Sequence, residues 1–326
     1  MTLVTDSAGT PWLQPQNLRV ADIATALQSP DTPETVSSRY QITANDWSDI
    51  LPLLLGTPSM ASFPPDVRDA VRLADISARL GPYALCVSGY ASVADLDAIE
   101  TCLGQTPIPE ATIHQRLFAL VMQPRVRAQQ LVGRFLKISL FEEFAYLIDA
   151  ASMAFYRGNR VCAFLSLLPV IEGLLLRWQG YPGPVASRPS YKKSIQFLAD
   201  APTRQPYPAS VLFFVSWGDA AAAILRDHLF LDTTSGTAVG YFSRHLALHL
   251  LEDREFATTE NIARLFLLLD VLSDLYLAER RIPDPRFMVS DDETRAHVIA
   301  YTSALRSQDQ LDQPERILRV HPKCRK

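Results

Sequence analysis

Glycine is scarce in this chain, and runs in which apolar and polar residues alternate are few. Only 13 of the 326 residues are glycine, whereas apolar residues spaced three and four apart recur along almost the whole length. Alternation with a period of two is typical of strands, and the i, i+3, i+4 spacing is typical of amphipathic helices. The sequence therefore predicts an all-α protein.

A large excess of charge of one sign is also missing. The chain carries 31 basic and 35 acidic residues, which gives a formal net charge of -4. Long nucleic acids are bound mainly through basic surfaces that neutralise many phosphates. The near balance argues against an extended groove for nucleic acid, so any such contact has to be local.

Cysteine pairs are missing as well. The four cysteines lie far apart and none forms a Cys-x-x-Cys pair: they are Cys86, Cys102, Cys162 and Cys324. This spacing excludes a zinc knuckle and a thioredoxin-like redox pair. Isolated cysteines are typical of proteins in a reducing compartment.

The sequence contains no recognisable secretory signal and no uninterrupted membrane span. The first residues lack a basic region followed by an apolar one, and Asp6 interrupts them early. The most apolar stretch, residues 161–178, contains Pro169, Glu172 and Arg177, which makes it a poor span. We therefore expect a cytoplasmic protein with no membrane partner.

Capping residues, prolines and glycines mark where helices begin and end. Serine followed by an acidic residue three positions later is typical of a capping box, and Asn or Thr before an apolar run is typical of an N-cap. The residues expected to begin helices in this way are Ser92, Asn159, Ser190, Thr258 and Ser290. The expected helices span residues 65–81, 92–103, 141–157, 159–178, 190–198, 209–229, 237–254 and 258–282, with a last one from 290.

The most suggestive chemistry lies in the segment Arg244-His245-Leu246-Ala247-Leu248-His249. Each helical residue turns about 100°, so His245 and His249 lie about 40° apart and face the same way. That is also metal-ligand spacing, but a zinc protease needs Glu directly after the first His, and position 246 is Leu. With no clear third ligand, we predict neither a metal nor another cofactor.

An arginine beside imidazoles is suited to phosphate chemistry. Arg stays charged and donates several hydrogen bonds, while His gives or takes a proton near neutral pH. Metal-free RNA cleavage needs a base, an acid and a cation. The flanking residues are apolar, so burying these groups is costly unless they line a cleft or an interface. Equally open from the residues alone is a solvated helix face.

The motif and two flanking segments resemble a known family. Arg-x4-His with a polar residue after the Arg resembles the signature of the HEPN superfamily of helical ribonucleases and binding modules. The surroundings look like a prokaryotic HEPN subgroup associated with abortive infection and other defence systems. The two flanking matches are the Leu-Leu-Pro-x-Ile-Glu-Gly-Leu-Leu segment at 167–175 and the Thr-x-Glu-Asn segment at 258–261, whose leucine-rich continuation ends at Asp270. The resemblance covers roughly residues 140 to 282.

The resemblance implies a fold and a set of roles. The implied organisation is a HEPN-type helical bundle at 138–285, an additional N-terminal helical region of unassigned role at 1–137, and a C-terminal helix with a basic tail at 286–326. Arg244 and His249 are the implied catalytic pair, and His245 is a supporting polar group. HEPN active sites are commonly composite, with the motif helices of two protomers meeting, so a homodimer is implied.

Helix geometry agrees with the implied homodimer, whereas two residues depart from the pattern of the subgroup. Arg244 and His249 lie about 140° apart on one helix, so a single helix aims both groups at one point poorly, and a second copy removes the difficulty. The subgroup often has Asn before the Arg and Gly after the second His, where this chain has Ser243 and Leu250. The bulkier Leu250 affects helix packing near the cleft.

Three functional hypotheses follow. The first is a metal-independent endoribonuclease, acting as a toxin-like or antiviral defence effector, that cleaves RNA by attack of the 2′-hydroxyl. Its partners are the RNA substrate, a second copy of the chain, and an antitoxin or regulatory protein. The second is a catalytically inactive HEPN-type module that binds RNA, a nucleotide or a protein partner. The third and weakest is a metal-dependent enzyme that uses His245 and His249.

Other polar residues have less specific patterns. Glu172 is a lone carboxylate in an apolar helix that lines the cleft or pairs with a neighbouring Arg, and we favour pairing while retaining it as a supporting site residue. Asp270 and Asp274, four residues apart, are expected on an exposed face. The remaining expectations are that Arg226-Asp227-His228 forms a solvated helix end and that Trp178 and Tyr241 fill the core.

Overall fold

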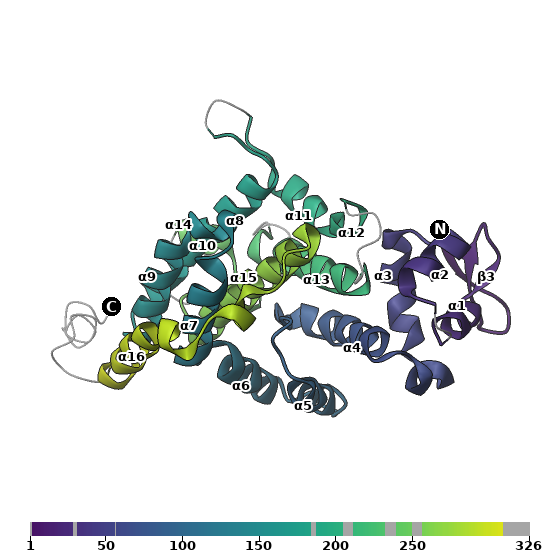
Figure 1. The fold of residues 1–326 in the computed structure, drawn as a ribbon, viewed down its shortest axis with the longest axis horizontal. Coiled ribbons are helices and arrows are strands. Elements are labelled where there is room, and N and C mark those ends of the chain that lie inside the picture. Colours follow the sequence, from purple (N-terminus) through teal and green to yellow (C-terminus); the bar gives the residue numbers. More distant parts are fainter. Residues whose placement is uncertain are drawn as a thin grey trace.

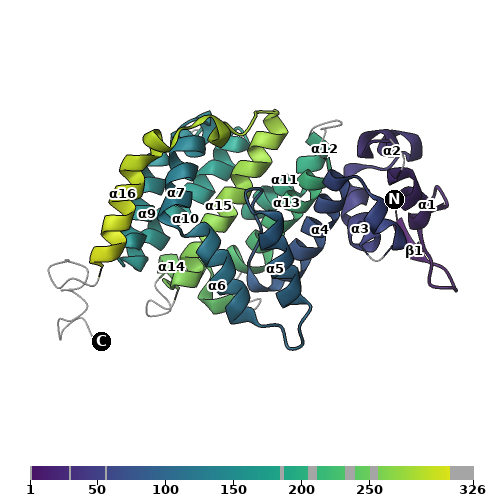
Figure 2. The ribbon, with the colours of Figure 1, turned by 60° about the horizontal axis from the view of Figure 1, so that its bottom comes forward.

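The structure is a computed structural model that describes residues 2–28, 31–55, 57–183, 187–204, 211–231, 239–249 and 256–308. The predicted all-α character is confirmed, since helices dominate the chain and the strands are few and short. Figures 1 and 2 show the first elements at one end of an elongated molecule and the last helix, α16, at the other. Residues 309–326, which include the expected basic tail, lie outside the described residues.

Three short strands precede the helices, although only helices were expected there. Strands β1 (Thr2–Thr5), β2 (Pro11–Gln14) and β3 (Leu18–Arg19) form an antiparallel sheet in that order. The Asp6 carboxylate closes the first turn by accepting the backbone N–H groups of Ala8 and Thr10 and the indole N–H of Trp12. Strands of two to four residues are too short to produce a readable alternation.

The helices of the N-terminal half follow this sheet in the chain, and α1 packs against it. They are α1 (Val20–Leu27), α2 (Pro33–Tyr40), α3 (Ala44–Leu54), α4 (Pro65–Leu80), α5 (Val93–Leu103), α6 (Glu110–Val121) and α7 (Pro124–Gln130). Short turns of other helical types complete this half: η1 (Pro58–Ser62), η2 (Gly81–Tyr83) and the π-helical η3 (Leu131–Phe135).

The helices of the C-terminal half contain the Arg244–His249 motif and its two flanking segments. They are α8 (Ser139–Glu142), α9 (Ala145–Tyr156), α10 (Arg160–Trp178), α11 (Tyr191–Ala199), α12 (Ala201–Arg204), α13 (Val211–Ile224), α14 (Arg244–His249), α15 (Thr259–Arg280) and α16 (Asp291–Ser307). The shorter turns are the π-helical η4 (Leu225–Leu229), η5 (Val239–Tyr241) and η6 (Pro285–Met288). The five expected N-caps are confirmed, because each of their side chains accepts the backbone N–H three residues on.

Two hydrophobic cores meet at α4 and α13. The smaller one joins the sheet and helices α1 to α4 with Leu212 and Val215 of α13. The larger one runs from Leu73 in α4 to Ala304 in α16 and is centred on α15, which is buried along nearly its whole length. Because both α4 and α13 contribute to both cores, the N-terminal elements are held directly against the C-terminal ones. The expected boundary between residues 137 and 138 stays a prediction.

Among the described residues, α10 is the one helix long and apolar enough to cross a membrane by length and composition. Half of that stretch is buried inside the protein. Its closest neighbours are α9, with which it forms a helical hairpin, and α15. A core helix of a soluble protein has these properties, so the burial of α10 accounts for its apolar sequence.

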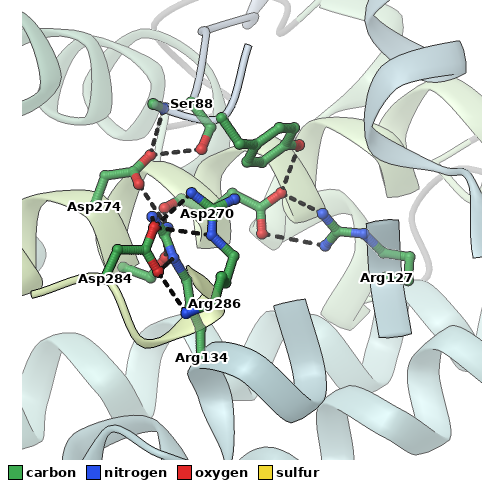
Figure 3. Close-up of polar contacts among 10 residues, drawn as sticks. Ser88, Arg127, Arg134, Asp270, Asp274, Asp284 and Arg286 are labelled. Carbon is green, nitrogen blue, oxygen red and sulfur yellow. Dashed lines mark hydrogen bonds and ion pairs between the residues drawn. The ribbon is translucent and has the colours of Figure 1, made fainter. Parts of the chain in front are cut away.

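A buried ionic network corrects the expectation for Asp270 and Asp274. Instead of facing solvent, the two residues are 0% and 4% exposed. Asp270 pairs with Arg127 of α7, whose side chain is 1% exposed, and also accepts the hydroxyl of Tyr90 at 2.9 Å. Asp274 accepts the hydroxyl of Ser88 at 2.5 Å (Figure 3). The polar side of α15 is therefore covered by other parts of the chain rather than by water.

The network continues to the segment after α15. Arg134 of η3 pairs with Asp274 at 2.6 Å and with Asp284 at 2.6 Å, and Arg286 pairs with Asp284 at 2.6 Å (Figure 3). Burial acts to raise the pKa of Asp284, but the hydrogen bonds from Arg134 and Arg286 outweigh it and hold that pKa well below its usual range. Asp284 thus ties η6 to the core.

We predict that Asp284→Asn destabilises the fold in a pH-dependent way. A carboxylate with a lowered pKa in the folded state stabilises the fold above its unfolded pKa, and this contribution is lost as the pH falls through the folded pKa. The wild type should therefore be more stable than the variant at neutral pH, and the difference should shrink below about pH 4. Urea unfolding from neutral to acid pH measures it, and a pH-independent difference would contradict the assignment.

Candidate functional site

The motif helix α14 begins at Arg244, later than expected. Residues 239–241 form the turn η5, in which Gly240 and Tyr241 have left-handed φ values of 54° and 56°, so the expected continuous helix from 237 is wrong at its start. Ser243 caps α14, because its carbonyl accepts the N–H of Ala247 at 3.2 Å. Residues 250–254, with Leu250, lie outside the described residues.

Arg244 makes an ion pair with Glu172 of α10. The contact joins Nε of Arg244 to Oε1 of Glu172, and Arg188 binds the other carboxylate oxygen, Oε2, at 2.7 Å. The expected pairing of Glu172 is thereby confirmed, and its partner is the motif arginine itself. The two side chains are largely sheltered, with Glu172 12% and Arg244 22% exposed.

Tyr191, the first residue of α11, lies against both arginines. The guanidinium carbon of Arg244 is 4.7 Å from the ring centroid and that of Arg188 is 5.7 Å away, distances typical of cation–π contacts. Phe230 supports the ring at a centroid distance of 4.5 Å. Burial and the Glu172 carboxylate raise the pKa of the Tyr191 hydroxyl. We call Glu172, Arg188, Tyr191 and Arg244 the Arg–Glu cluster.

The Arg–Glu cluster carries a local positive charge at the surface. Two arginines and one carboxylate leave one net positive charge, and Lys192 and Lys193 are exposed directly after Tyr191. The pocket beside it has a volume of about 10 Å³, enough for about one water molecule. The pocket is therefore too small for a larger ligand, and the accessible part of the cluster is the surface where Arg188 is 47% exposed.

Of the two motif histidines, the structure describes the side chain of His245 only. His245 is exposed on α14, next to a buried Ala247 and a 46% exposed Leu248. The backbone of His249 ends the helix, but its side chain lies outside the described residues. The expected convergence of Arg244 and His249 across two copies of α14 therefore stays a prediction.

Asn261, from the Thr-x-Glu-Asn segment, holds the chain on both sides of α14. Its amide nitrogen donates to the carbonyl of Gly240 at 2.6 Å and to that of Phe256 at 2.9 Å. Arg264 in turn donates to the side-chain oxygen of Asn261 at 2.6 Å and to the carbonyl of Tyr83 at 3.0 Å. Burial lowers the pKa of Arg264 to about 10. Both flanking segments that suggested the family thus contact the motif region.

Within the described ranges, no group of three His, Cys, Asp or Glu side chains could hold a metal ion. The side chain of His249 lies outside that set, so the weak metal hypothesis for His245 and His249 is left without a described third ligand. Cys86 and Cys102 are buried and Cys162 is exposed, each as a free thiol.

The expectations for residues outside the motif were confirmed in part. Trp178 lies in the core as expected, 8% exposed. Arg226 and Asp227 pair on the surface at 2.8 Å, as expected for a solvated helix end. His228 does not belong with them: it is 8% exposed, and its Nε2 lies 2.9 Å from the carbonyl of Gly81. His228 is therefore a packing residue, and its burial lowers the pKa of its imidazole.

Sequence reasoning missed Arg188 and Tyr191. Arg188 lies in the Gly- and Pro-rich loop after α10 and Tyr191 begins the next helix, where neither periodicity nor motif spacing assigns a role. The one usable signal was the N-cap at Ser190, which places Tyr191 at the start of a helix but gives no direction in space.

Comparison of the chain with family models, with curated proteins and with solved structures finds no match. The function of the protein is therefore inferred from the residues and contacts described above.

Proposed function

We propose that this chain is a metal-independent endoribonuclease of HEPN type, a cytoplasmic toxin-like or defence effector that acts as a homodimer. The observation that carries the proposal is the ion pair between Glu172 and Arg244. It joins the Ile-Glu segment to the motif arginine, 72 residues away. Asn261 of the third segment holds the chain on both sides of the same helix, so three separate segments contribute to one constellation.

The proposed roles follow from the chemistry of the side chains. Glu172 engages Nε of Arg244, one of the five N–H donors of a guanidinium. The remaining donors stabilise negative charge that develops on the phosphate in the transition state. His249 exchanges protons with the reacting oxygens. His245 is a supporting polar group at the exposed edge.

The reaction is an internal transfer of the phosphate. The 2′-hydroxyl loses its proton to a base and its oxygen bonds to the neighbouring phosphorus, while the bond from phosphorus to the 5′-oxygen breaks and that oxygen takes a proton from an acid. The products are a 2′,3′-cyclic phosphate and a 5′-hydroxyl. One helix aims Arg244 and His249 about 140° apart, so facing helices of two protomers supply the complete site.

The test is an assay of purified protein on total RNA with excess chelator. The proposal predicts cleavage that survives chelation and leaves 2′,3′-cyclic phosphate ends. Absence of cleavage, or cleavage that needs an added divalent metal, would overturn the ribonuclease proposal.

Glu172→Gln distinguishes a role of Glu172 in positioning Arg244 from a role in RNA binding. The variant keeps the shape of the side chain but raises the net charge of the Arg–Glu cluster from one positive to two. We expect RNA to bind more tightly, because phosphate affinity rises with local positive charge, and to be cleaved at least about tenfold more slowly, because Arg244 loses its charged partner. Filter binding and single-turnover cleavage measure the two effects. Equal falls in binding and in cleavage would show that Glu172 only supports the fold.

A catalytically inactive module that binds RNA, a nucleotide or a protein partner is the second candidate. It is favoured by the engagement of Arg244 with Glu172 within one chain and by the stacking of both arginines on Tyr191, an arrangement suited to holding a phosphate or a base. RNA binding that is lost in Arg188→Ala, together with no cleavage by the wild type, would support this candidate.

A further inference from the structure

A cavity of about 320 Å³ lies between α3, α4 and α13, on the side of the N-terminal elements. None of its lining residues belongs to the Arg–Glu cluster. They are Ser48, Leu51, Pro52, Ala74, Ser77, Ala78, Gly81, Ala199, Val215, Ser216, Asp219, Ala220, Ala222, Ala223 and Arg226. The volume reaches the lower end of the range of small-molecule sites, about 300 to 1,000 Å³, whereas voids between packed helices seldom exceed a water molecule.

Small side chains keep this space open. Most of the lining positions carry Ala, Ser or Gly, and a Cβ atom added at Gly81 would meet no other atom within 4 Å. Leu51, Val215 and Ala222 are buried and provide apolar surface at the inner wall. Pro52, Ala78 and Arg226 are exposed and mark the opening.

Asp219 is the one carboxylate among the described lining residues, and Arg226 at the opening is the one cation. The Asp219 carboxylate is hydrogen-bonded by the Ser48 hydroxyl. Pro52 lies inside α3 and has no N–H, so the Ser48 carbonyl lacks its usual helical partner. Ser77 is 5% exposed, and its hydroxyl oxygen makes no hydrogen bond to any of the described residues. That oxygen has less than 1 Å² of accessible surface, so it lies within the cavity wall and does not face the cavity.

The charged groups around Asp219 indicate which class of ligand fits the cavity. The charged groups near Asp219 are Asp49 on α3 and Arg226 on η4, and Arg226 is held by Asp227 at 2.8 Å. Burial raises the pKa of Asp219, with Asp49 acting in the same direction, which is the behaviour of a carboxylate with too little positive charge nearby. A ligand that brings a cation completes the site.

We propose that this cavity binds a small molecule that carries a protonated primary amine on a compact apolar body. An ammonium group has three N–H donors and no acceptor, which complements the Asp219 carboxylate and the Ser48 carbonyl. The apolar body packs against Leu51 and Val215. This site lies outside the proposed ribonuclease site and does not depend on it.

The test uses the full-length protein with phenethylammonium chloride as the probe and calorimetric titration as the readout. The wild type binds the probe, and Asp219→Asn weakens that binding at least about tenfold, because a hydrogen bond to a charged group is lost. Asp66→Asn is the matched control: it removes an exposed carboxylate in the first turn of α4 that does not line the cavity, and it leaves the affinity unchanged. The neutral analogue 2-phenylethanol binds at least about tenfold more weakly than the ammonium.

Three outcomes overturn the proposal. They are no heat of binding and no rise in melting temperature at about 10 mM probe, equal affinity in Asp219→Asn, and equal affinity for 2-phenylethanol. Circular dichroism checks that Asp219→Asn is folded. Should it fail to fold, Ala78→Trp decides, since it places a large side chain at the exposed opening of the cavity at little cost to the fold and weakens probe binding only if the probe occupies the cavity.

Discussion

Alanine at Arg244 or at His249 is expected to lower the rate of RNA cleavage at least about 100-fold, with the fold retained. Arg244→Ala removes the cation proposed to stabilise developing charge, and His249→Ala removes the proposed proton-transfer group. The loss should appear in the single-turnover rate at saturating enzyme, where the weaker RNA binding expected from the lost charge of Arg244 does not limit cleavage.

Controls distinguish this loss from a general loss of charge or of structure. Arg295→Ala removes an arginine whose side chain is 72% exposed and pairs only loosely with Asp292, at 3.6 Å, so it should cleave RNA at the wild-type rate. Circular dichroism spectra of all variants should overlay. Undiminished metal-free cleavage by both purified motif variants would refute the assigned roles.

The largest effect on stability is expected for Asp270→Ala, which should lower the free energy of unfolding by about 3 to 5 kcal/mol. The substitution leaves the Arg127 guanidinium charged and 1% exposed without its carboxylate partner, and also removes the acceptor for the Tyr90 hydroxyl. Burial acts to lower the pKa of Arg127, but Asp270 raises it above its ordinary value, so the arginine depends on this carboxylate to remain buried as a cation.

Asp291→Ala is the matched control for that effect. It also breaks a pair between an aspartate and an arginine, but Arg125 and Asp291 are 64% and 77% exposed, and exposed pairs contribute less than about 1 kcal/mol. Urea unfolding of the two variants and the wild type measures the difference. Equal destabilisation by the two substitutions would contradict the view that burial makes the Asp270 pair critical.

The sequence was most informative where structure is set locally. The helix starts at Ser92, Asn159, Ser190, Thr258 and Ser290 depend on a cap within one turn, and all five were predicted. The start of α14 was not, because Tyr241 adopts a left-handed conformation that its residue type does not signal. Strands β1 to β3 were missed because they are too short for periodicity to register.

Tertiary contacts were the part that the sequence could not supply. Periodicity identified a polar side on α15, but it does not reveal that the segment with Ser88 and Tyr90 and the helix with Arg127 cover that side. In the candidate site, too, some residues were predicted from the sequence and others were not. Arg244 and the pairing of Glu172 were anticipated from residue type, whereas Arg188 and Tyr191 join them only through the path of the loop after α10.

The central claim is that RNA is cleaved through its own 2′-hydroxyl without a metal. The most direct measurement incubates the protein, in excess chelator, with one RNA and with its copy methylated at every 2′-oxygen. The account predicts that the RNA is cut to fragments with 2′,3′-cyclic phosphate and 5′-hydroxyl ends, and that the methylated copy stays intact. Cleavage of the methylated copy, or no cleavage of either, would contradict it.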